Sequence, residues 1–207
     1  MDLFILLNAH LHFTMRQNNS IRNLPESRFP RMFMQLYLSP IGQLLLTADD
    51  TALVALRFYD AEHSCLSAED TACNDHAILQ AARHWLDVYF SGQEPRFMPP
   101  LRPTGTAFQQ EVWQLLMAIP YGKTTTYGEI AAVLAARRGI PRMSAQAVGG
   151  AVGRNPIPIF IPCHRVVGSG GKLTGYSGGL ERKQFLLSNE HIDNSTLQCN
   201  PCLSALL

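Results

Sequence analysis

The sequence lacks any long hydrophobic run, and this absence excludes a conventional membrane-spanning helix. None of its apolar stretches approaches the roughly 20 residues that are needed to cross a bilayer. A short apolar patch at residues 3–7 follows only Met1 and Asp2, so it lacks the positively charged segment of a secretory signal. We therefore expect a cytoplasmic protein.

Cysteine is scarce, and its spacing fits neither a disulfide framework nor a zinc site. The five cysteines of the 207-residue chain are Cys65, Cys73, Cys163, Cys199 and Cys202. An odd number of cysteines is typical of free thiols in a reducing compartment. His63 and His76 lie near the first two cysteines without a recognised ligand spacing, and the C-terminal Cys-x-x-Cys has no second ligand pair. We predict no metal site.

Charged residues are few, and the two signs are unevenly distributed. The formal net charge is only +1, but residues 1–101 carry seven Lys/Arg against eleven Asp/Glu. Residues 102–190 carry ten Lys/Arg against four Asp/Glu, a net charge of +6. A localised positive field favours a polyanionic partner such as nucleic acid. A solvated basic face is the alternative.

Short apolar runs in the first half predict a small sheet followed by a helix. Turn sequences separate three expected strands, at residues 34–38, 43–48 and 53–59. Helical spacing then predicts a helix that ends at Gly92. The residues expected on its inward face are Ile78, Ala82, Trp85, Leu86 and Tyr89.

A proline-rich stretch marks the expected boundary between two domains. Pro95, Pro99, Pro100 and Pro103 lie close to the point where the charge changes sign. We expect a poorly ordered N-terminal extension, an N-terminal domain, a C-terminal domain and a tail. Their expected bounds are 1–31, 32–100, 101–191 and 192–207.

Three helices are predicted in the second half. Thr106 and Gln109 form a capping-box pattern, and an apolar stripe follows them as far as Pro120. Two further helices are expected at residues 127–137 and from Ser144 to about residue 153.

The last two of these helices are joined by a glycine-containing turn, which is typical of a helix-turn-helix. Many helical hairpins share this pattern without touching DNA, but the nearby basic residues favour a DNA-binding role: Lys123, Arg137, Arg138, Arg142 and Arg154. Small residues on the second helix, among them Ala147, Gly149 and Gly150, would let its backbone approach a surface closely. Each interior glycine costs roughly 1 kcal/mol in a helix. Tight packing against another helix explains them equally well.

Residues 155–165, which read Asn-Pro-Ile-Pro-Ile-Phe-Ile-Pro-Cys-His-Arg, are the most informative stretch. The apolar run before Cys163 predicts a buried strand with the thiol at its end. His164 and Arg165 follow directly, and neighbouring cations lower a thiol pKa from its usual ~8.5, which favours the nucleophilic thiolate. A buried structural cysteine is the alternative, although the His-Arg pair makes inert apolar surroundings a poorer explanation.

These motifs resemble those of the methylated-DNA–protein-cysteine methyltransferases, which repair O-6-alkylguanine in DNA. The strongest matches are Pro-Cys-His-Arg-Val at 162–166 and Gly-Tyr-Ser-Gly-Gly-Leu at 175–180. The other matching segments are 108–109 with 112–113, 119–122, 127–131 and 155–157, together with Lys183. The resemblance is dense over residues 104–190 and weaker over residues 34–100.

The resemblance implies an α/β N-terminal domain with a small ribonuclease-H-like sheet. It also implies a mainly α C-terminal domain with a helix-turn-helix that enters the minor groove of double-stranded DNA. The alkyl group would move irreversibly from the guanine oxygen to the protein's own cysteine, so each molecule, acting as a monomer, reacts once and uses no cofactor. O-4-methylthymine is a further substrate that the sequence leaves open.

By this resemblance, Cys163 is the alkyl acceptor, and His164 is the general base, which acts on the thiol through a water molecule. Glu190 lies where the family has the acid that orients this histidine, in a relay with the logic of a hydrolase triad. Asn155 would stabilise the turn between the recognition helix and the active-site strand. Because adjacent side chains of a strand point to opposite faces, we expect no direct hydrogen bond between Cys163 and His164.

The resemblance also implies residues that contact the damaged base or the DNA. Tyr176 and Ser177 would line the base pocket, and Tyr127 would press on the phosphate of the target nucleotide. Without the motif, Tyr127 would be interpreted as a core residue of an amphipathic helix. The other residues expected at the DNA or the substrate are Gln146, Ala147, Gly149, Gly150, Arg165 and Lys183.

Two other functions are compatible with parts of the sequence. A cysteine hydrolase also uses a cysteine, a histidine and an acid, but it needs an oxyanion hole, for which the sequence gives no independent signal. A module that only binds alkylated DNA would have no need of the acceptor, and the presence of Cys163 disfavours it.

Gln146 departs from the family pattern and generates a first prediction. Many members have an arginine here that enters the base stack in place of the extruded nucleotide. Glutamine is shorter and uncharged, although it can still form hydrogen bonds with the orphaned cytosine. We expect Gln146→Arg to raise the affinity for alkylated DNA and the rate of repair, measured by DNA titration and single-turnover kinetics. Unchanged affinity and rate would contradict this interpretation.

Overall fold

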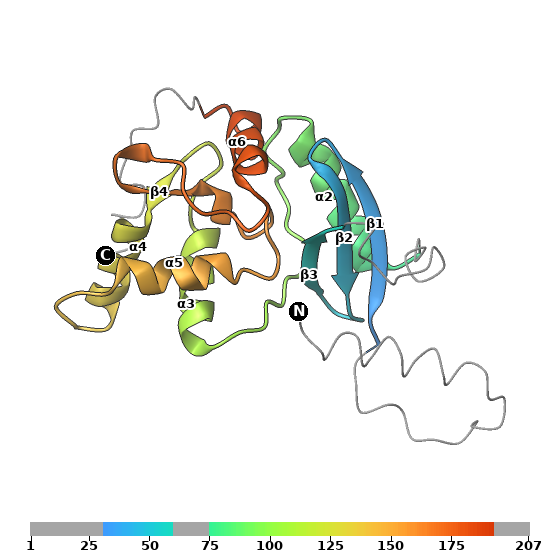
Figure 1. Ribbon diagram of the computed structural model, residues 1–207. Coiled ribbons are helices and arrows are strands. Elements are labelled where there is room, and N and C mark those ends of the chain that lie inside the picture. The colour runs from blue at the N-terminus through green and yellow to red at the C-terminus, as the bar shows by residue number, and fades with distance from the viewer. Residues whose placement is uncertain (1–30, 60–74, 193–207) are drawn as a thin grey trace, which may run out of the picture. The chain divides into compact units, whose positions relative to one another are not determined.

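Three antiparallel strands open the fold, as the sequence pattern predicted. The computed structural model describes residues 31–59 and 75–192, and it places β1 at Phe33–Ser39, β2 at Gly42–Ala48 and β3 at Leu53–Phe58. The strand order is β1-β2-β3 (Figure 1). Ser39 pairs with Gly42 across the first hairpin, where Gly42 has a φ of 108° that only glycine adopts easily.

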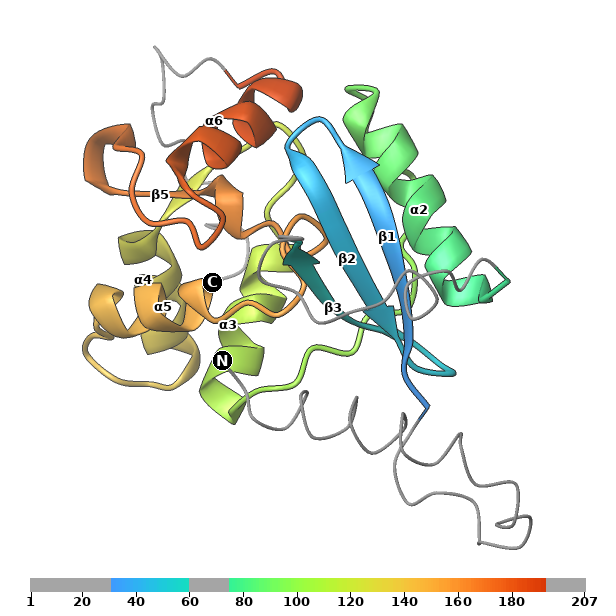
Figure 2. The ribbon, with the colours of Figure 1, turned by 45° about the vertical axis from the view of Figure 1, so that its right-hand side comes forward.

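Helix α2, Ala77–Phe90, packs against β1 and β2 (Figure 2). Most of the inward face predicted from the sequence is buried, and only Ile78 is left partly exposed. The helix ends close to Gly92, which has a φ of 79°. The buried residues of α2 are Leu79, Ala82, Trp85, Leu86 and Tyr89.

The outer edge of β3 is covered by the second half of the chain. The amide of Leu53 donates to the carbonyl of Pro100 (2.8 Å), and the amide of Arg102 donates back to Leu53 (2.9 Å). The amide of Leu56 donates to the carbonyl of Pro156 (3.0 Å). The proline-rich stretch therefore runs along the sheet, and it occupies an edge that could otherwise pair with another chain.

Three helices follow at the predicted positions. They are α3 (Ala107–Met117), α4 (Tyr127–Arg137) and α5 (Ala145–Gly153). The capping box of Thr106 and Gln109 is confirmed at the start of α3. Helices α4 and α5 pack against each other and against α3, which gives the arrangement of a helix-turn-helix.

The remaining elements bring the reactive segment close to the start of α4. Short strands β4 (Thr125–Thr126) and β5 (Val166–Val167) pair in parallel. Strand β5 directly follows the single-turn 3₁₀ helix η2 (Cys163–Arg165). A second 3₁₀ turn, η3 (Ser169–Gly171), and helix α6 (Leu180–Asn189) complete the described chain. Helix α6 is not among the elements predicted from the sequence.

The predicted strand before Cys163 was wrong. Residues 156–162 form a tight turn, in which Pro158 and Ile161 make a single bridge, and Cys163 begins η2. Three prolines in seven residues lack amide donors and have a fixed φ, so they cannot sustain a strand ladder. Ile159 in this turn has a φ of 75°, a strained conformation for a β-branched residue.

Aromatic side chains join the sheet and α2 to the second half of the chain. Trp85 of α2 contacts Phe160 with ring centroids 4.4 Å apart, and Phe58 of β3 contacts Tyr176 edge to face at 6.3 Å. The Arg182 guanidinium lies over the Phe58 ring and donates to the carbonyl of Ile41 (2.9 Å). None of the described helices is both long and apolar enough to span a bilayer.

Gly178 allows the close approach of Phe58, which generates a prediction about stability. A Cβ at this position would lie 2.3 Å from a Phe58 ring atom and 2.8 Å from the Tyr176 ring. We expect Gly178→Ala to lower the free energy of unfolding by about 1–3 kcal/mol, because both rings must move. Urea denaturation measures this loss.

Gly153→Ala is the matched control, because the residue belongs to α5 and, apart from its chain neighbours and the adjacent backbone of its own helix, no atom lies within 4 Å of the added methyl group. A loss of stability as large in Gly153→Ala as in Gly178→Ala would contradict the packing explanation.

Candidate active site

Cys163 is buried, and its surroundings favour the protonated thiol. Its side chain begins η2 and the residue is 4% exposed. Burial raises the pKa of the Cys163 thiol to about 11, although Asn155, Lys183 and nearby backbone amides oppose this effect. The prediction that the flanking cations lower this pKa was therefore wrong, because desolvation dominates and Arg165 pairs with Glu190. A base is needed to form the thiolate.

His164 is fully buried and forms a hydrogen bond with a carboxylate. Its Nε2 lies 2.7 Å from Oε1 of Glu190, at the C-terminal end of α6. Burial lowers the pKa of His164, and Glu190 offsets this only in part. A neutral imidazole that donates from Nε2 has its lone pair on Nδ1, and Nδ1 is buried without a partner among the described residues. The residue that follows Cys163 therefore has a basic nitrogen, Nδ1, without a hydrogen-bond partner among the described residues.

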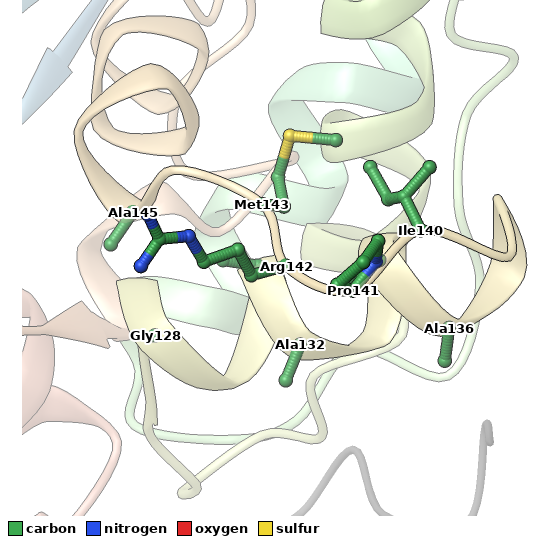
Figure 3. Close-up of a pocket in the computed structure, with 10 residues that line it drawn as sticks. Gly128, Ala132, Ala136, Ile140, Pro141, Arg142, Met143 and Ala145 are labelled. Atoms are coloured by element: carbon green, nitrogen blue, oxygen red, sulfur yellow. The ribbon is translucent and has the colours of Figure 1, made fainter.

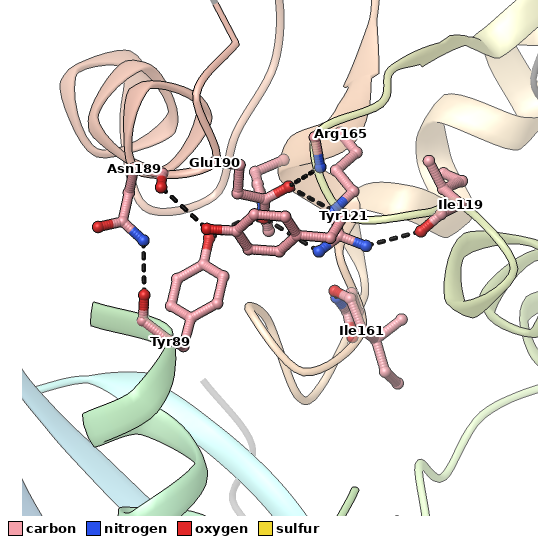
Figure 4. A network of polar contacts seen from close by, with 10 residues as sticks. Tyr89, Ile119, Tyr121, Ile161, Arg165, Asn189 and Glu190 are labelled. Atoms are coloured by element: carbon pink, nitrogen blue, oxygen red, sulfur yellow. Dashed lines mark hydrogen bonds and ion pairs between the residues drawn. The ribbon is translucent and has the colours of Figure 1, made fainter. Parts of the chain in front are cut away.

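Glu190 is a buried carboxylate, and several hydrogen-bond donors surround it (Figure 4). Oε1 accepts hydrogen bonds from Tyr89 (2.8 Å), His164 (2.7 Å) and Arg165 Nη2 (3.0 Å). Oε2 accepts from Arg165 Nε (2.8 Å) and from the amide of Gly122 (3.1 Å). Burial raises the pKa of Glu190, but His164 and Arg165 outweigh it and lower this pKa to about 2.

Residues 119–122, one of the segments that carried the resemblance, surround the ion pair of Arg165 and Glu190. The carbonyl of Ile119 accepts from Arg165 Nη1 (2.6 Å), and the guanidinium lies 5.7 Å from the centre of the Tyr121 ring. Tyr121 donates to the carbonyl of Asn189 (2.9 Å). This segment therefore fixes the carboxylate that contacts His164.

Asn155 holds the turn that leads from α5 to Cys163. Its Nδ2 donates to the carbonyl of Ile161 (2.7 Å), and its Oδ1 accepts from the amide of Ile157 (3.0 Å). A hydrogen bond from its side chain also lowers the pKa of Cys163. The predicted bonding of this amide to the backbone is confirmed, and the thiol is an additional contact.

Comparison with known families identifies both halves of the chain. Residues 32–103 match the family model described as the ribonuclease-like domain of 6-O-methylguanine DNA methyltransferase. Residues 107–192 match the DNA binding domain of the same family. The chain belongs to the 6-O-methylguanine DNA methyltransferase family.

Individual members of this methyltransferase family are similar over most of the chain. A methylated-DNA–protein-cysteine methyltransferase of Methanosarcina acetivorans is 43% identical over 77% of this chain and 98% of its own length. The relative of the same name from Haemophilus influenzae is 41% identical, over 82% of this chain and 94% of its own. A crystal structure of Mycobacterium tuberculosis OGT in complex with DNA is 42% identical, with a TM-score of 0.63 over 76% of this chain and 92% of that one.

Helix α5 presents its small residues to solvent. Gln146, Ala147 and Gly150 are exposed, whereas Val148, Ala151 and Val152 form its buried side. Tight helix packing therefore does not explain Ala147 and Gly150, but it does apply to Ala151, whose carbonyl accepts from Trp113 Nε1 of α3 (2.9 Å). Gly149 is half-buried, and a Cβ there would lie 3.7 Å from the Tyr127 ring.

The predicted base-pocket residues lie on the segment before α6. Tyr176 is half-buried, and its hydroxyl is buried without a partner among the described residues, while Ser177 is exposed. Tyr127 donates to the carbonyl of Thr174 (3.4 Å). The structure thus places Tyr127 beside the same segment, although α4 begins far from it in the sequence.

Arg165 and Lys183, which were predicted to lie at the DNA or the substrate, are both buried. Arg165 is 8% exposed and is used by Glu190 and Ile119. Lys183 is fully buried, and its Nζ donates to the carbonyls of Val166 (2.6 Å) and Thr174 (2.7 Å). Burial lowers the pKa of Lys183 to about 8. Both cations support the segments around Cys163 from inside.

A shallow groove of about 430 Å³ lies on α4 and the turn before α5 (Figure 3). Small and apolar side chains line it, together with Arg142. None of its lining residues belongs to the Cys163 and Glu190 network. The groove is therefore a separate feature of the helix-turn-helix.

The structure leaves the metal prediction open. Among the described residues, no group of three or more His, Cys, Asp or Glu side chains could hold a metal ion. His76, which stacks on Phe33, is described, but the other residues weighed as ligands lie outside the described ranges: His63, Cys65, Cys73, Cys199 and Cys202.

Removal of Arg165 tests the buried ion pair. We expect Arg165→Met to lower the free energy of unfolding at neutral pH by about 3–5 kcal/mol, because Glu190 is left buried without its cation. The pKa of Glu190 in the folded protein is lowered to about 2. The ionised carboxylate therefore stabilises the fold at pH values above its ordinary pKa of 4.5, and this stabilisation is lost as the pH falls toward 2. The difference between the variant and the wild type should therefore shrink below about pH 4.5.

The matched control is Arg138→Met, which breaks the exposed pair with Glu111. It should cost less than about 1 kcal/mol at any pH. Equal losses in the two variants, measured by urea denaturation across pH, would show that burial does not set the strength of the Arg165 pair.

Proposed function

We propose that this chain repairs alkylated DNA by moving an alkyl group from O-6 of guanine to Sγ of Cys163. The observation that supports this most directly is the position of His164. Its Nε2 is held by Glu190, so the lone pair of the neighbouring Nδ1 is available to remove the thiol proton. The names of the relatives and the DNA complex of a similar structure agree with this reaction.

The proposed reaction begins with transfer of the Cys163 proton to Nδ1 of His164 through a water molecule. The thiolate then attacks the alkyl carbon, a sulfur–carbon bond forms and the carbon–oxygen bond breaks. The electron pair of the broken carbon–oxygen bond stays with the base. The base then takes up one proton, which balances the proton removed from the thiol, and becomes guanine. No step restores the thiol, so each molecule would react once. No cofactor enters this balance.

The high pKa of Cys163 is compatible with this role. A thiolate becomes more nucleophilic as the pKa of its thiol rises. Asn155, Lys183 and the amides near Cys163 would stabilise the anion when it forms. The site would therefore keep the thiol protonated until a base removes its proton next to the substrate.

We also propose that α5 is the surface that approaches double-stranded DNA. Its exposed Ala147 and Gly150 allow the helix backbone to come close, and Gln146 lies beside them. A guanine must leave the base stack to reach a buried thiol, which costs a few kcal/mol. Tyr127 would press on the phosphate, and the unpartnered hydroxyl of Tyr176 would gain a partner when the base enters.

The organisation of the protein follows from the same proposal. Residues 32–100 and 101–191 would act as two domains of one monomer, between an extension at 1–31 and a tail at 192–207. The protein would act in the cytoplasm, where reducing conditions keep Cys163 a thiol.

Incubation with duplex DNA that contains O-6-methylguanine tests this function. We expect the protein to gain the mass of one methylene unit, once per molecule, with the modified peptide containing Cys163. Cys163→Ser should gain none, while the double variant Cys199→Ser, Cys202→Ser should react like the wild type. Intact-mass and peptide mass spectrometry measure both outcomes.

Other results would favour the alternatives. Repeated turnover of an ester or peptide without mass gain would indicate a hydrolase. Tight binding of the lesion without transfer would indicate a binding module. Mass gain by Cys163→Ser would overturn the assignment of the acceptor.

A further inference from the structure

Helix α2 of the N-terminal half contributes a side chain to the pair formed by His164 and Glu190. Tyr89 is fully buried, and its hydroxyl donates to Oε1 of Glu190 at 2.8 Å (Figure 4). The hydroxyl oxygen of Tyr89 also lies 3.3 Å from Nε2 of His164. Glu190 is 101 residues from Tyr89 in the sequence, so only the tertiary structure brings these groups together.

The hydrogen-bond directions at this contact are fixed by the charges. Glu190 is ionised and can only accept, so the single proton of the Tyr89 hydroxyl points to Oε1. Nε2 of His164 donates to the same Oε1. Tyr89 therefore shares one carboxylate oxygen with His164 and does not accept the imidazole proton in the ground state.

We propose that Tyr89 is a positioning residue for alkyl transfer, which sets the orientation and the basicity of His164 through Glu190. This inference rests on the proposed function, in which Nδ1 of His164 is the base. By sharing Oε1, the phenol reduces the negative charge available to Nε2–H. The imidazole is then held firmly but is not drawn strongly toward its protonated form.

The backbone of α2 is anchored to both sides of the reactive site. Asn189 precedes Glu190 in the chain, and its Nδ2 donates to the carbonyl of Tyr89 (2.7 Å). The Tyr89 ring stacks on Trp85, whose indole contacts Phe160 in the turn before Cys163. The N-terminal half thus supports both the histidine's partner and the segment that carries the thiol.

Several charged or titratable groups face His164 and act on it together. They are Glu190 and Lys183 from the α6 region, Arg165 from η2, and Tyr89 from α2, with Cys163 adjacent in the chain. Only Tyr89 can be changed by removing one hydroxyl group without altering a charge. This makes Tyr89→Phe a clean test.

We expect Tyr89→Phe to shift the acidic limb of the pH–rate profile for single-turnover alkyl transfer upward by about one pH unit. Without the phenol, Oε1 attracts the Nε2 proton more strongly, the pKa of His164 rises, and the base is protonated at higher pH. The rate on the acidic limb should fall about tenfold, while the plateau at higher pH stays within about twofold of the wild type.

Tyr37→Phe is the matched control. Tyr37 also donates a phenolic proton to a carboxylate over 2.8 Å, here to Asp87 on α2, and it is also buried. Its pH–rate profile should coincide with that of the wild type. A second readout, independent of transfer, is the pKa of ¹⁵N-labelled His164, measured by titration of the protein without DNA. This pKa should rise in Tyr89→Phe but not in Tyr37→Phe.

Two results would overturn the inference. One is a Tyr89→Phe profile and ¹⁵N titration that coincide with the wild type. The other is a uniform loss of rate at every pH with no shift in the titration, which would indicate a purely structural contact. Failure of the proposed function is distinguishable, because the wild-type protein itself would then gain no mass from O-6-methylguanine.

Discussion

The buried carboxylate of Glu190 is the constraint on which the rest of the site depends. It receives donors from α2, from η2 and from the turn after α3, so elements distant in sequence converge on one anion. A buried carboxylate without such partners would be costly, and its charge survives only because Arg165 and the hydrogen bonds compensate for desolvation. This anion fixes the tautomer of His164 and leaves Nδ1 free.

Cys163 differs from an exposed, acidic thiol in being buried and in having a raised pKa. Burial raises the pKa of its thiol, and Asn155, Lys183 and the nearby backbone amides offset this effect only in part. Such a thiol is protected from oxidants and metals, which react with thiolates. A site that reacts only once per molecule benefits from that protection.

The second half of the chain combines an exposed face on α5 with a buried polar network. Gln146, Ala147 and Gly150 are available at the surface of α5, while Arg165 and Lys183 hold the interior. Two of the cations of the basic second half are thus buried and bonded inside the protein. Arg165 neutralises Glu190, and Lys183 binds backbone carbonyls between Cys163 and α6.

Most of the local elements could be predicted from the sequence, although α6 was not, because strand alternation, capping boxes and helical spacing are short-range properties. The pattern predicted α4 and α5 to within a residue. The family resemblance singled out Cys163, His164, Glu190 and Asn155 as candidate site residues. Three features arise from the packing of segments that are distant in the sequence. The proline-rich segment before Cys163 is a turn, burial raises the thiol pKa, and Tyr89 contacts Glu190. Desolvation and long-range contacts depend on which elements pack together, and no local spacing encodes that.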